Sequence, residues 1–188
     1  MKLPNIKKDE LITNTNKFIN QYYVDINSLT KGELIDEPRL GLKKWLTVDN
    51  VIEIYNQLRI TFGGICTVRS PQDLEWIMDV PNRAIKILNI GNSSPLLDQI
   101  IETADLFLRY RPLASKNVQV SLLVMLNLLK INDFVIDTEK GDLFSIFKGR
   151  LDNIQAMSVS DTLNDYETYE KFRDALLPHI RRVNEGEK

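Results

Sequence analysis

Apolar residues recur every three to four positions along most of the chain, which predicts a mainly α-helical protein. The strongest case is residues 96–110, where Leu97, Ile100, Ile101, Ala104 and Leu108 share one face of a helix. The predicted helices cover residues 9–26, 47–62, 70–80, 96–110, 116–131, 143–147 and 166–183.

Helix ends are marked by capping and breaking residues. Thr47 is a good N-cap, and Gly63-Gly64 stops the helix that follows it. Ser70-Pro71 combines a capping serine with proline at the first helical position. Gly149 is expected to interrupt the helix that begins at Leu143, and the last helix is expected to run from about Tyr166 to Val183.

One predicted helix, about residues 115–131, is apolar around its whole circumference. Such a helix has no face to give to water, so it belongs at the centre of a bundle. The predicted fold is therefore a mainly α bundle around this central helix. Two short apolar runs, residues 84–90 and 134–137, favour extended structure and at most one small hairpin or flap.

The chain divides at about residue 44. Residues 1–44 form an N-terminal appendage whose second part, rich in glycine and proline, is a linker or a strand-containing loop. Residues 45–188 form the main helical domain, which is long enough for a core of its own.

The composition and charge of the chain indicate which kinds of protein it can be. A hydrophobic content of 43% and a charged content of 27% are typical of a folded domain. The net charge of −2 argues against a nucleic-acid binder, and the single cysteine, Cys66, fits a reducing compartment. The longest apolar stretch, residues 118–131, is broken by four polar residues and does not span a membrane. A cytoplasmic location is expected.

Residues 45–81, WLTVDNVIEIYNQLRITFGGICTVRSPQDLEWIMDVP, resemble the start of the death-on-curing (Doc) branch of the Doc/Fic family. Doc-like proteins share a Leu-Thr helix start, a helix that ends in Phe-Gly-Gly, a loop with an arginine, and a helix that ends at proline. Here these features are Leu46-Thr47, Phe62-Gly63-Gly64, Arg69 and the segment from Leu74 to Pro81.

Residues 104–152 resemble the catalytic half of that family. In the family, a helix leads into the loop His-Pro-Phe-x-(Asp/Glu/Asn)-(Gly/Ala)-Asn-(Lys/Gly)-Arg, which opens the central helix. The resemblance implies the Fido fold, and it implies a phosphate-binding loop at that helix start. It also assigns the histidine as general base, the acidic residue as metal ligand and the arginine as the group that neutralises charge.

Most of that motif is replaced in this chain. Arg111 stands at the histidine position, and an arginine cannot act as a base near neutral pH. Ser115 stands at the acidic position and Gln119 at the arginine position. Leu113 replaces the phenylalanine and Lys116 the small residue, whereas Pro112 and Asn117 match.

The candidate site is therefore degenerate, with no confident catalytic residue and no metal site. The residues Arg109, Arg111, Lys116 and Asn117 can still hold an anion, including ATP or another nucleotide. The alternative is that these residues are solvated surface charge around a vestigial loop, and it is favoured about two to one over anion binding. The only histidine, His179, lies far from the motif in the sequence.

Three functions remain open. The first is a pseudoenzyme of Doc/Fic type that binds a protein, either an antitoxin-like helix or a target, in a toxin-antitoxin, phage (prophage) or defence setting. The second is a divergent nucleotidyl- or phosphotransferase that uses another base, such as Asp98 or Asp105, with Arg111 and Lys116 on the phosphates. The third, nucleic-acid binding, is the weakest.

Overall fold

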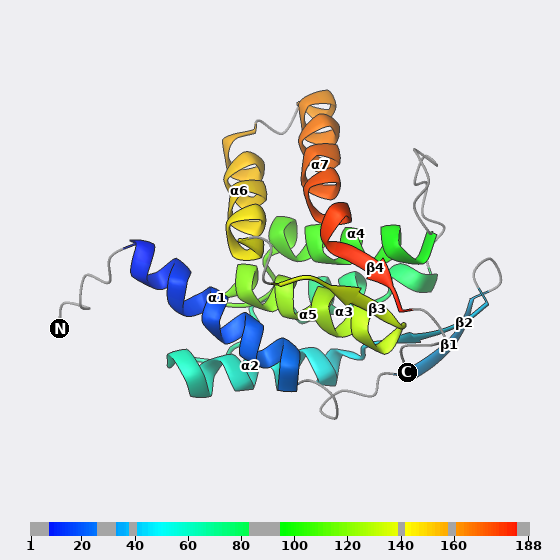
Figure 1. Ribbon diagram of the computed structural model, residues 1–188, viewed down its shortest axis with the longest axis horizontal. Helices are drawn as coiled ribbons and strands as arrows, with labels where there is room; N and C mark the ends of the chain where they lie inside the picture. The colour runs from blue at the N-terminus through cyan, green and yellow to red at the C-terminus, as the bar shows by residue number, and fades with distance from the viewer. Residues whose placement is uncertain are drawn as a thin grey trace.

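The computed structural model describes residues 8–25, 33–37, 41–82, 95–138, 142–157 and 161–183 of the chain. The described part contains seven α-helices and four short strands, so the prediction of a mainly α fold is confirmed (Figure 1). The elements are α1 (Lys8–Asp25), β1 (Glu33–Glu37), β2 (Gly41–Trp45), α2 (Val48–Phe62), α3 (Pro71–Met78), the 3-10 helix η1 (Val80–Asn82), α4 (Pro95–Tyr110), α5 (Asn117–Ile131), β3 (Phe134–Ile136), α6 (Leu143–Ala156), α7 (Thr162–Leu176), the 3-10 helix η2 (Leu177–His179) and β4 (Ile180–Arg182).

Helix α5 is the centre of the molecule, as its sequence predicts. Val118 and every residue from Val120 to Leu129 are buried. Helices α1, α2, α4 and α6 all pack against α5, and Figure 1 shows it enclosed between them. Because these neighbours cover it on every side, the helix needs no polar stripe.

The predicted caps of α2 and α3 are present. Thr47 Oγ1 accepts a hydrogen bond from the Asn50 amide, and the Asn50 side chain accepts one from the Thr47 amide, which completes a capping box. Ser70 caps α3, with Pro71 at the first helical position. These caps fix where each helix starts, and therefore where the loop between α2 and α3 lies.

Helix α1 confirms the prediction of a helix over residues 9–26 and packs on α5 and α6. Ile19 and Tyr22 are buried in the common core. Asn127 Nδ2 on α5 donates to the Tyr22 hydroxyl at 2.6 Å. Burial raises the pKa of Tyr22 to about 12, although the Asn127 hydrogen bond acts in the opposite direction. The proposed division of the chain at residue 44 stays a prediction.

Two small antiparallel sheets are found among the described residues, where the sequence predicted at most one. Strands β1 and β2 form a hairpin in which Glu33 lies opposite Trp45. Strand β3, predicted as extended, pairs with β4, and Phe134 lies opposite Arg182. The run 84–90, predicted as a strand or flap, falls outside the described residues.

The prediction that Gly149 interrupts a helix is wrong. Helix α6 passes through Gly149 without a break and ends at Ala156. A glycine costs a helix only about 1 kcal/mol relative to alanine. The buried side chains Leu143, Phe144 and Phe147 hold α6 against its neighbours, and their packing outweighs that cost.

The prediction of a last helix from Tyr166 to Val183 is wrong at both ends. Helix α7 begins at Thr162, because Asp161 accepts a hydrogen bond from the Asn164 amide as N-cap. It ends at Leu176, two residues before Pro178, which has no amide hydrogen to continue the ladder. The chain then turns through η2 into β4.

We expect Gly149→Ala to stabilise the protein by about 0.5–1 kcal/mol. A Cβ at this position meets no atom within 4 Å, so the substitution removes unfolded-state entropy without a clash. Urea denaturation monitored by circular dichroism measures the change. As a matched control, Gly64→Ala should destabilise, since Gly64 has a φ of +102° that alanine tolerates poorly.

Candidate functional site

The chain between α4 and α5, residues 111–116, is the position at which the sequence placed the degenerate motif; we call it the motif loop. Two of its residues, Arg111 and Lys116, have φ of 46° and 59°, in the left-handed region. The loop lies against the segment between α2 and α3. The Arg69 and Ser70 amides both donate to the Pro112 carbonyl, at 2.7 and 3.0 Å, and the Ala114 amide donates to the Thr67 carbonyl at 2.9 Å.

The motif loop is closed by internal hydrogen bonds, and Asn117, which matches the family motif, makes two of them. The Leu113 amide donates to Asn117 Oδ1 at 3.1 Å, and Asn117 Nδ2 donates back to the Leu113 carbonyl at 2.9 Å. The Leu113 side chain is buried in the core, as expected for the residue that replaces the family phenylalanine. Asn117 therefore fixes the loop backbone by hydrogen bonds, and Leu113 anchors the loop in the core.

Ser115, at the position of the family's acidic residue, contacts the phenol of Tyr55. The two hydroxyl oxygens lie 3.1 Å apart, and the Ser115 amide also donates to the Tyr55 oxygen at 3.3 Å. The amides of Leu113, Ala114 and Ser115 are thus all bonded within the protein. In this conformation the three consecutive amides have no hydrogen left for a phosphate.

Two cations remain on the motif loop. The Arg111 side chain is exposed, and no ion pair is recorded for it among the described residues. The Lys116 ammonium lies beside Gly64, where an added Cβ would approach it to 3.1 Å. Lys116 occupies the N-cap of α5 without a side-chain cap bond, and Gln119 is half-buried in the first turn.

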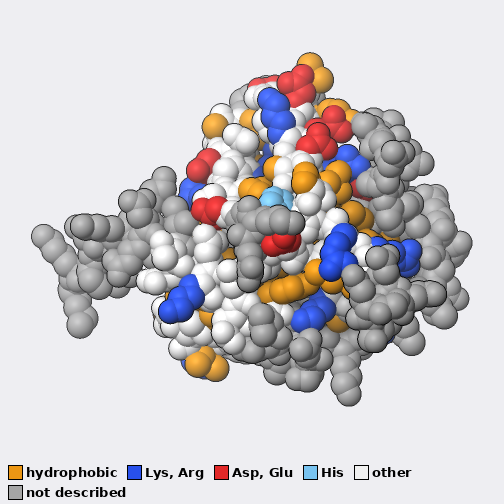
Figure 2. Space-filling model, in the orientation of Figure 1, with side chains coloured by type: hydrophobic (Ala, Val, Ile, Leu, Met, Phe, Trp, Pro, Cys, Tyr) orange, Lys and Arg blue, Asp and Glu red, His pale blue; other side chains and the backbone are white. Residues whose placement is uncertain are grey.

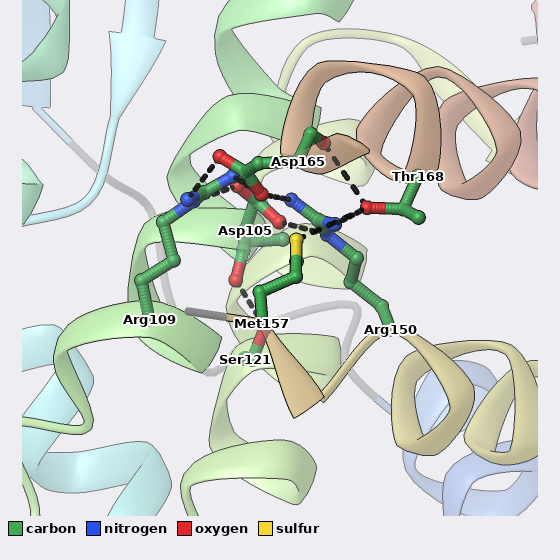
Figure 3. A network of polar contacts seen from close by, with 8 residues as sticks. Asp105, Arg109, Ser121, Arg150, Met157, Asp165 and Thr168 are labelled. Atoms are coloured by element: carbon green, nitrogen blue, oxygen red, sulfur yellow. Dashed lines mark hydrogen bonds and ion pairs between the residues drawn. The ribbon is translucent and has the colours of Figure 1, made fainter. Parts of the chain in front are cut away.

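The sequence grouped Arg109 with these cations, but the structure gives its guanidinium other partners. Arg109 Nε lies 2.5 Å from Asp105 Oδ2 one turn back on α4, and its terminal nitrogens bind both oxygens of Asp165 on α7, at 2.7 and 2.9 Å. Figure 3 shows Arg109 and Arg150 on either side of the two carboxylates. Arg109 is therefore committed to holding α7 against α4.

Arg150 on α6 completes this cluster and is fully buried. Its Nε donates to Asp105 Oδ1 at 2.7 Å, and its other nitrogens donate to Asp165 Oδ1 at 3.0 Å and Thr168 Oγ1 at 2.6 Å. We call Asp105, Arg109, Arg150, Asp165 and Thr168 the ionic cluster (Figure 3). With two arginines and two aspartates its net charge is zero, which is the condition for burying charge.

Arginines also bind both carboxylates considered as replacement bases, Asp105 in the ionic cluster and Asp98 outside it. Both oxygens of Asp105 accept from guanidinium groups, and the side chain is 3% exposed. Asp98 is also buried, and Arg173 Nε donates to it at 3.0 Å. A general base must reach the proton that it removes, and neither carboxylate faces the solvent.

Two pKa shifts in the ionic cluster have clear causes. Partial burial acts to lower the pKa of Arg109, but hydrogen bonds and charge from Asp165 and Asp105 outweigh it and raise the pKa. Partial burial acts to raise the pKa of Asp165, but its bonds to Arg109 and Arg150 outweigh this and lower it. Both groups are therefore held in their charged forms.

His179 lies in η2, at the other end of α7 from Asp165. At 1.5 Å per residue, the helix between Asp165 and Leu176 spans about 16 Å. His179 is half-buried, and its carbonyl accepts the Asp137 amide at 2.8 Å. The structure therefore does not bring the single histidine to the motif loop.

The sequence analysis missed Arg150 and Asp165, although a signal for Arg150 was available. Arg150 follows Leu143 by seven residues and Phe147 by three, so it falls on the apolar face of α6. A charged residue in a core position requires a buried partner. Asp105 follows Ile101 by four residues on the apolar face of α4 and carries the same signal.

Other classes of site receive no support from the described residues. No cluster of three or more His, Cys, Asp or Glu side chains suited to a metal ion is found there. No described helix has the length and apolar character that a bilayer span requires. On the face in Figure 2, the described acidic and basic side chains are interspersed rather than gathered in a basic stripe.

No protein-family model matches the chain, and searches of curated proteins and of solved structures find no significant match. The resemblance to the Doc/Fic family therefore rests on this chain's own residues. What the structure itself adds is a closed motif loop, two cations on that loop and an internal ionic cluster behind it.

We expect Arg150→Met to destabilise the protein by about 3 kcal/mol, because it leaves the buried Asp105 without one of its two partners. Chemical denaturation measures the free energy of unfolding. The double variant Asp105→Leu/Arg150→Met removes both charges, and it should be more stable than the sum of the two single variants predicts. Strict additivity would mean that the two side chains do not interact.

Asp165→Asn should change the acid sensitivity of the protein. The lowered pKa of Asp165 means that its contribution to stability is complete above a pH of about 4 and is lost as the pH falls through its folded-state value. We expect the variant to be less stable than wild type at pH 7, with the difference shrinking as the pH falls from about 4 toward about 2. A difference that stays constant over this range contradicts the assigned role.

Proposed function

We propose that this chain is a catalytically degenerate relative of the Doc/Fic family that acts by binding a protein. The observation that carries the proposal is the closed motif loop. Its central amides are bonded internally, and Arg111 stands where the family places its base. A loop of this kind keeps its place in the fold, but it lacks the base that phosphoryl transfer needs, and three of its amides are not available to a phosphate.

The packing of the two resembling segments supports the family part of the proposal. Residues 45–81 and 104–152 were matched separately, 22 residues apart in the sequence (82–103). In the structure they meet at the motif loop, where Arg69 and Ser70 of the first segment donate to Pro112 of the second. The second segment also contains the enclosed helix α5.

A protein of this kind works in the cytoplasm, in a toxin-antitoxin, phage or defence setting, with an antitoxin-like helix or a target protein as its partner. The single cysteine, Cys66, agrees with a reducing compartment, and its thiol is engaged with the Tyr55 carbonyl at 3.3 Å. The partner, not a nucleotide, supplies the biological specificity.

The second candidate is a divergent nucleotidyl- or phosphotransferase. It is favoured by the two cations that the motif loop keeps, Arg111 and Lys116, at the positive end of α5. This candidate requires the loop to open, because the loop amides are occupied in the closed form.

Calorimetric titration of the purified chain with ATP and with GTP, each with and without magnesium, separates the two candidates. We expect no binding below about 1 mM, since the Leu113, Ala114 and Ser115 amides are bonded within the protein and Ser115 replaces the family's metal ligand. Micromolar binding that Arg111→Ala and Lys116→Ala each weaken tenfold would instead favour the transferase. Lys171→Ala, which removes an exposed cation on α7 outside the loop, is the matched control.

A further inference from the structure

Five exposed side chains and the half-buried Lys116 surround the motif loop, and they are apolar, aromatic or basic. The residues are Ile65, Arg69, Trp76, Tyr110, Arg111 and Lys116, and we call them the aromatic-basic surface. They come from four places in the chain: the α2–α3 segment, α3, the end of α4 and the motif loop.

Direct contacts join these residues into one surface. The Trp76 and Tyr110 rings lie 5.0 Å apart between centroids. Arg69 Nη2 donates to the carbonyls of Tyr110 and Arg111, at 3.1 and 2.6 Å. On the other side, the Tyr55 hydroxyl bridges the Ile65 carbonyl to Ser115, next to Lys116. Because Tyr55 is buried, its bonds hold the Ile65 and Lys116 side of the loop from beneath.

The apolar members are unusually open to solvent for their size. Ile65 is 78% exposed, and Trp76 and Tyr110 are 42% and 43% exposed even though their rings contact each other. The chain's other tryptophan, Trp45, is buried in the core. Tryptophan, tyrosine and arginine are the residue types that contribute most to binding at protein interfaces. Their gathering at one place indicates a docking surface.

The charge on this surface favours an acidic partner. No ion pair is recorded for Arg69, Arg111 or Lys116 among the described residues. The N-terminus of α5, which lies beneath Lys116 without a side-chain cap, adds positive potential. Three acidic residues, Asp73, Glu75 and Asp79, lie on α3 or at its C-cap around Trp76, so the positive charge belongs to the loop side of the aromatic pair.

We propose that the aromatic-basic surface binds an acidic segment of a partner protein that carries an aromatic or branched apolar anchor. The anchor packs on Trp76 and Tyr110, and the carboxylates lie over Arg69, Arg111 and Lys116. The inference rests on the proposed function, since it names the partner chemistry of the same loop. It adds which residues bind and which segment they select.

Random-peptide display on the full-length chain tests this inference without knowledge of the partner. Wild-type protein is used for selection, and Trp76→Ala/Arg111→Glu protein is used to remove peptides that bind elsewhere. We expect enriched peptides with several Asp or Glu residues beside an aromatic or aliphatic residue. Fluorescence anisotropy of an enriched peptide should show that Trp76→Ala, Arg111→Glu and Lys116→Glu each raise Kd about tenfold, and that added salt weakens binding.

Leu163→Ala is the matched control, because Leu163 is 70% exposed on α7, outside this surface. It should leave Kd unchanged, and circular dichroism should show every variant folded. Enriched peptides without acidic residues, peptides that bind the double variant equally well, or no enrichment at all would overturn the inference. So would a wild-type dimer in solution that Trp76→Ala converts to a monomer, because a second copy would then cover the surface.

The two proposals fail in different ways. Tight nucleotide binding in the calorimetric titration overturns the proposed function but leaves the peptide result to stand on its own. Loss of the acidic consensus overturns the docking inference, whereas absence of nucleotide binding still supports a degenerate site.

Discussion

The burial of α5 is the constraint on which the rest of the structure depends. A 15-residue helix with a buried, almost wholly apolar middle cannot face water, so other elements must cover its whole circumference. Helices α1, α2, α4 and α6 do so, and the loops between them are placed as a consequence. The motif loop directly precedes α5 in the chain. The conformation of the loop therefore depends on how α5 packs in the core as well as on the loop's own residues.

The ionic cluster attaches α7 to α4 and α6. This helix is largely polar outside, with Phe172 and Leu176 among its few buried apolar side chains. Asp165 and Arg173 provide its remaining anchors, to Arg109 and Arg150 in one place and to Asp98 in another. Such pairs add little net stability compared with apolar packing. They can form, however, in only one register of α7 on α4 and α6. The cluster therefore positions α7, and it makes Arg109 and Asp105 unavailable for other chemistry, as Arg173 does for Asp98.

The motif loop combines a structural interior with an outer surface available for binding. Inside, Asn117 and Tyr55 accept hydrogen bonds from the Leu113 and Ser115 amides, which are then not available to a phosphate. Outside, Arg111 and the Trp76–Tyr110 pair are exposed, and Lys116 is half-buried beside them. This division explains how a chain can keep the frame of a phosphate loop while presenting a surface better suited to a peptide. The left-handed backbone at Arg111 and Lys116 is the local strain that this arrangement carries.

The sequence by itself determined the helical class, the central position of α5 and the caps at Thr47 and Ser70, because each depends on local periodicity or on hydrogen bonds between near neighbours. It also determined which residue types stand at the motif. Only the tertiary structure decided that Gly149 stays helical, that Arg109 belongs to a buried cluster and that Trp76 is exposed. Each of these depends on partners that are distant in the sequence, such as Arg150 with Asp105 across 45 residues. Periodicity shows which face of a helix is buried, but it does not identify the side chains that meet there.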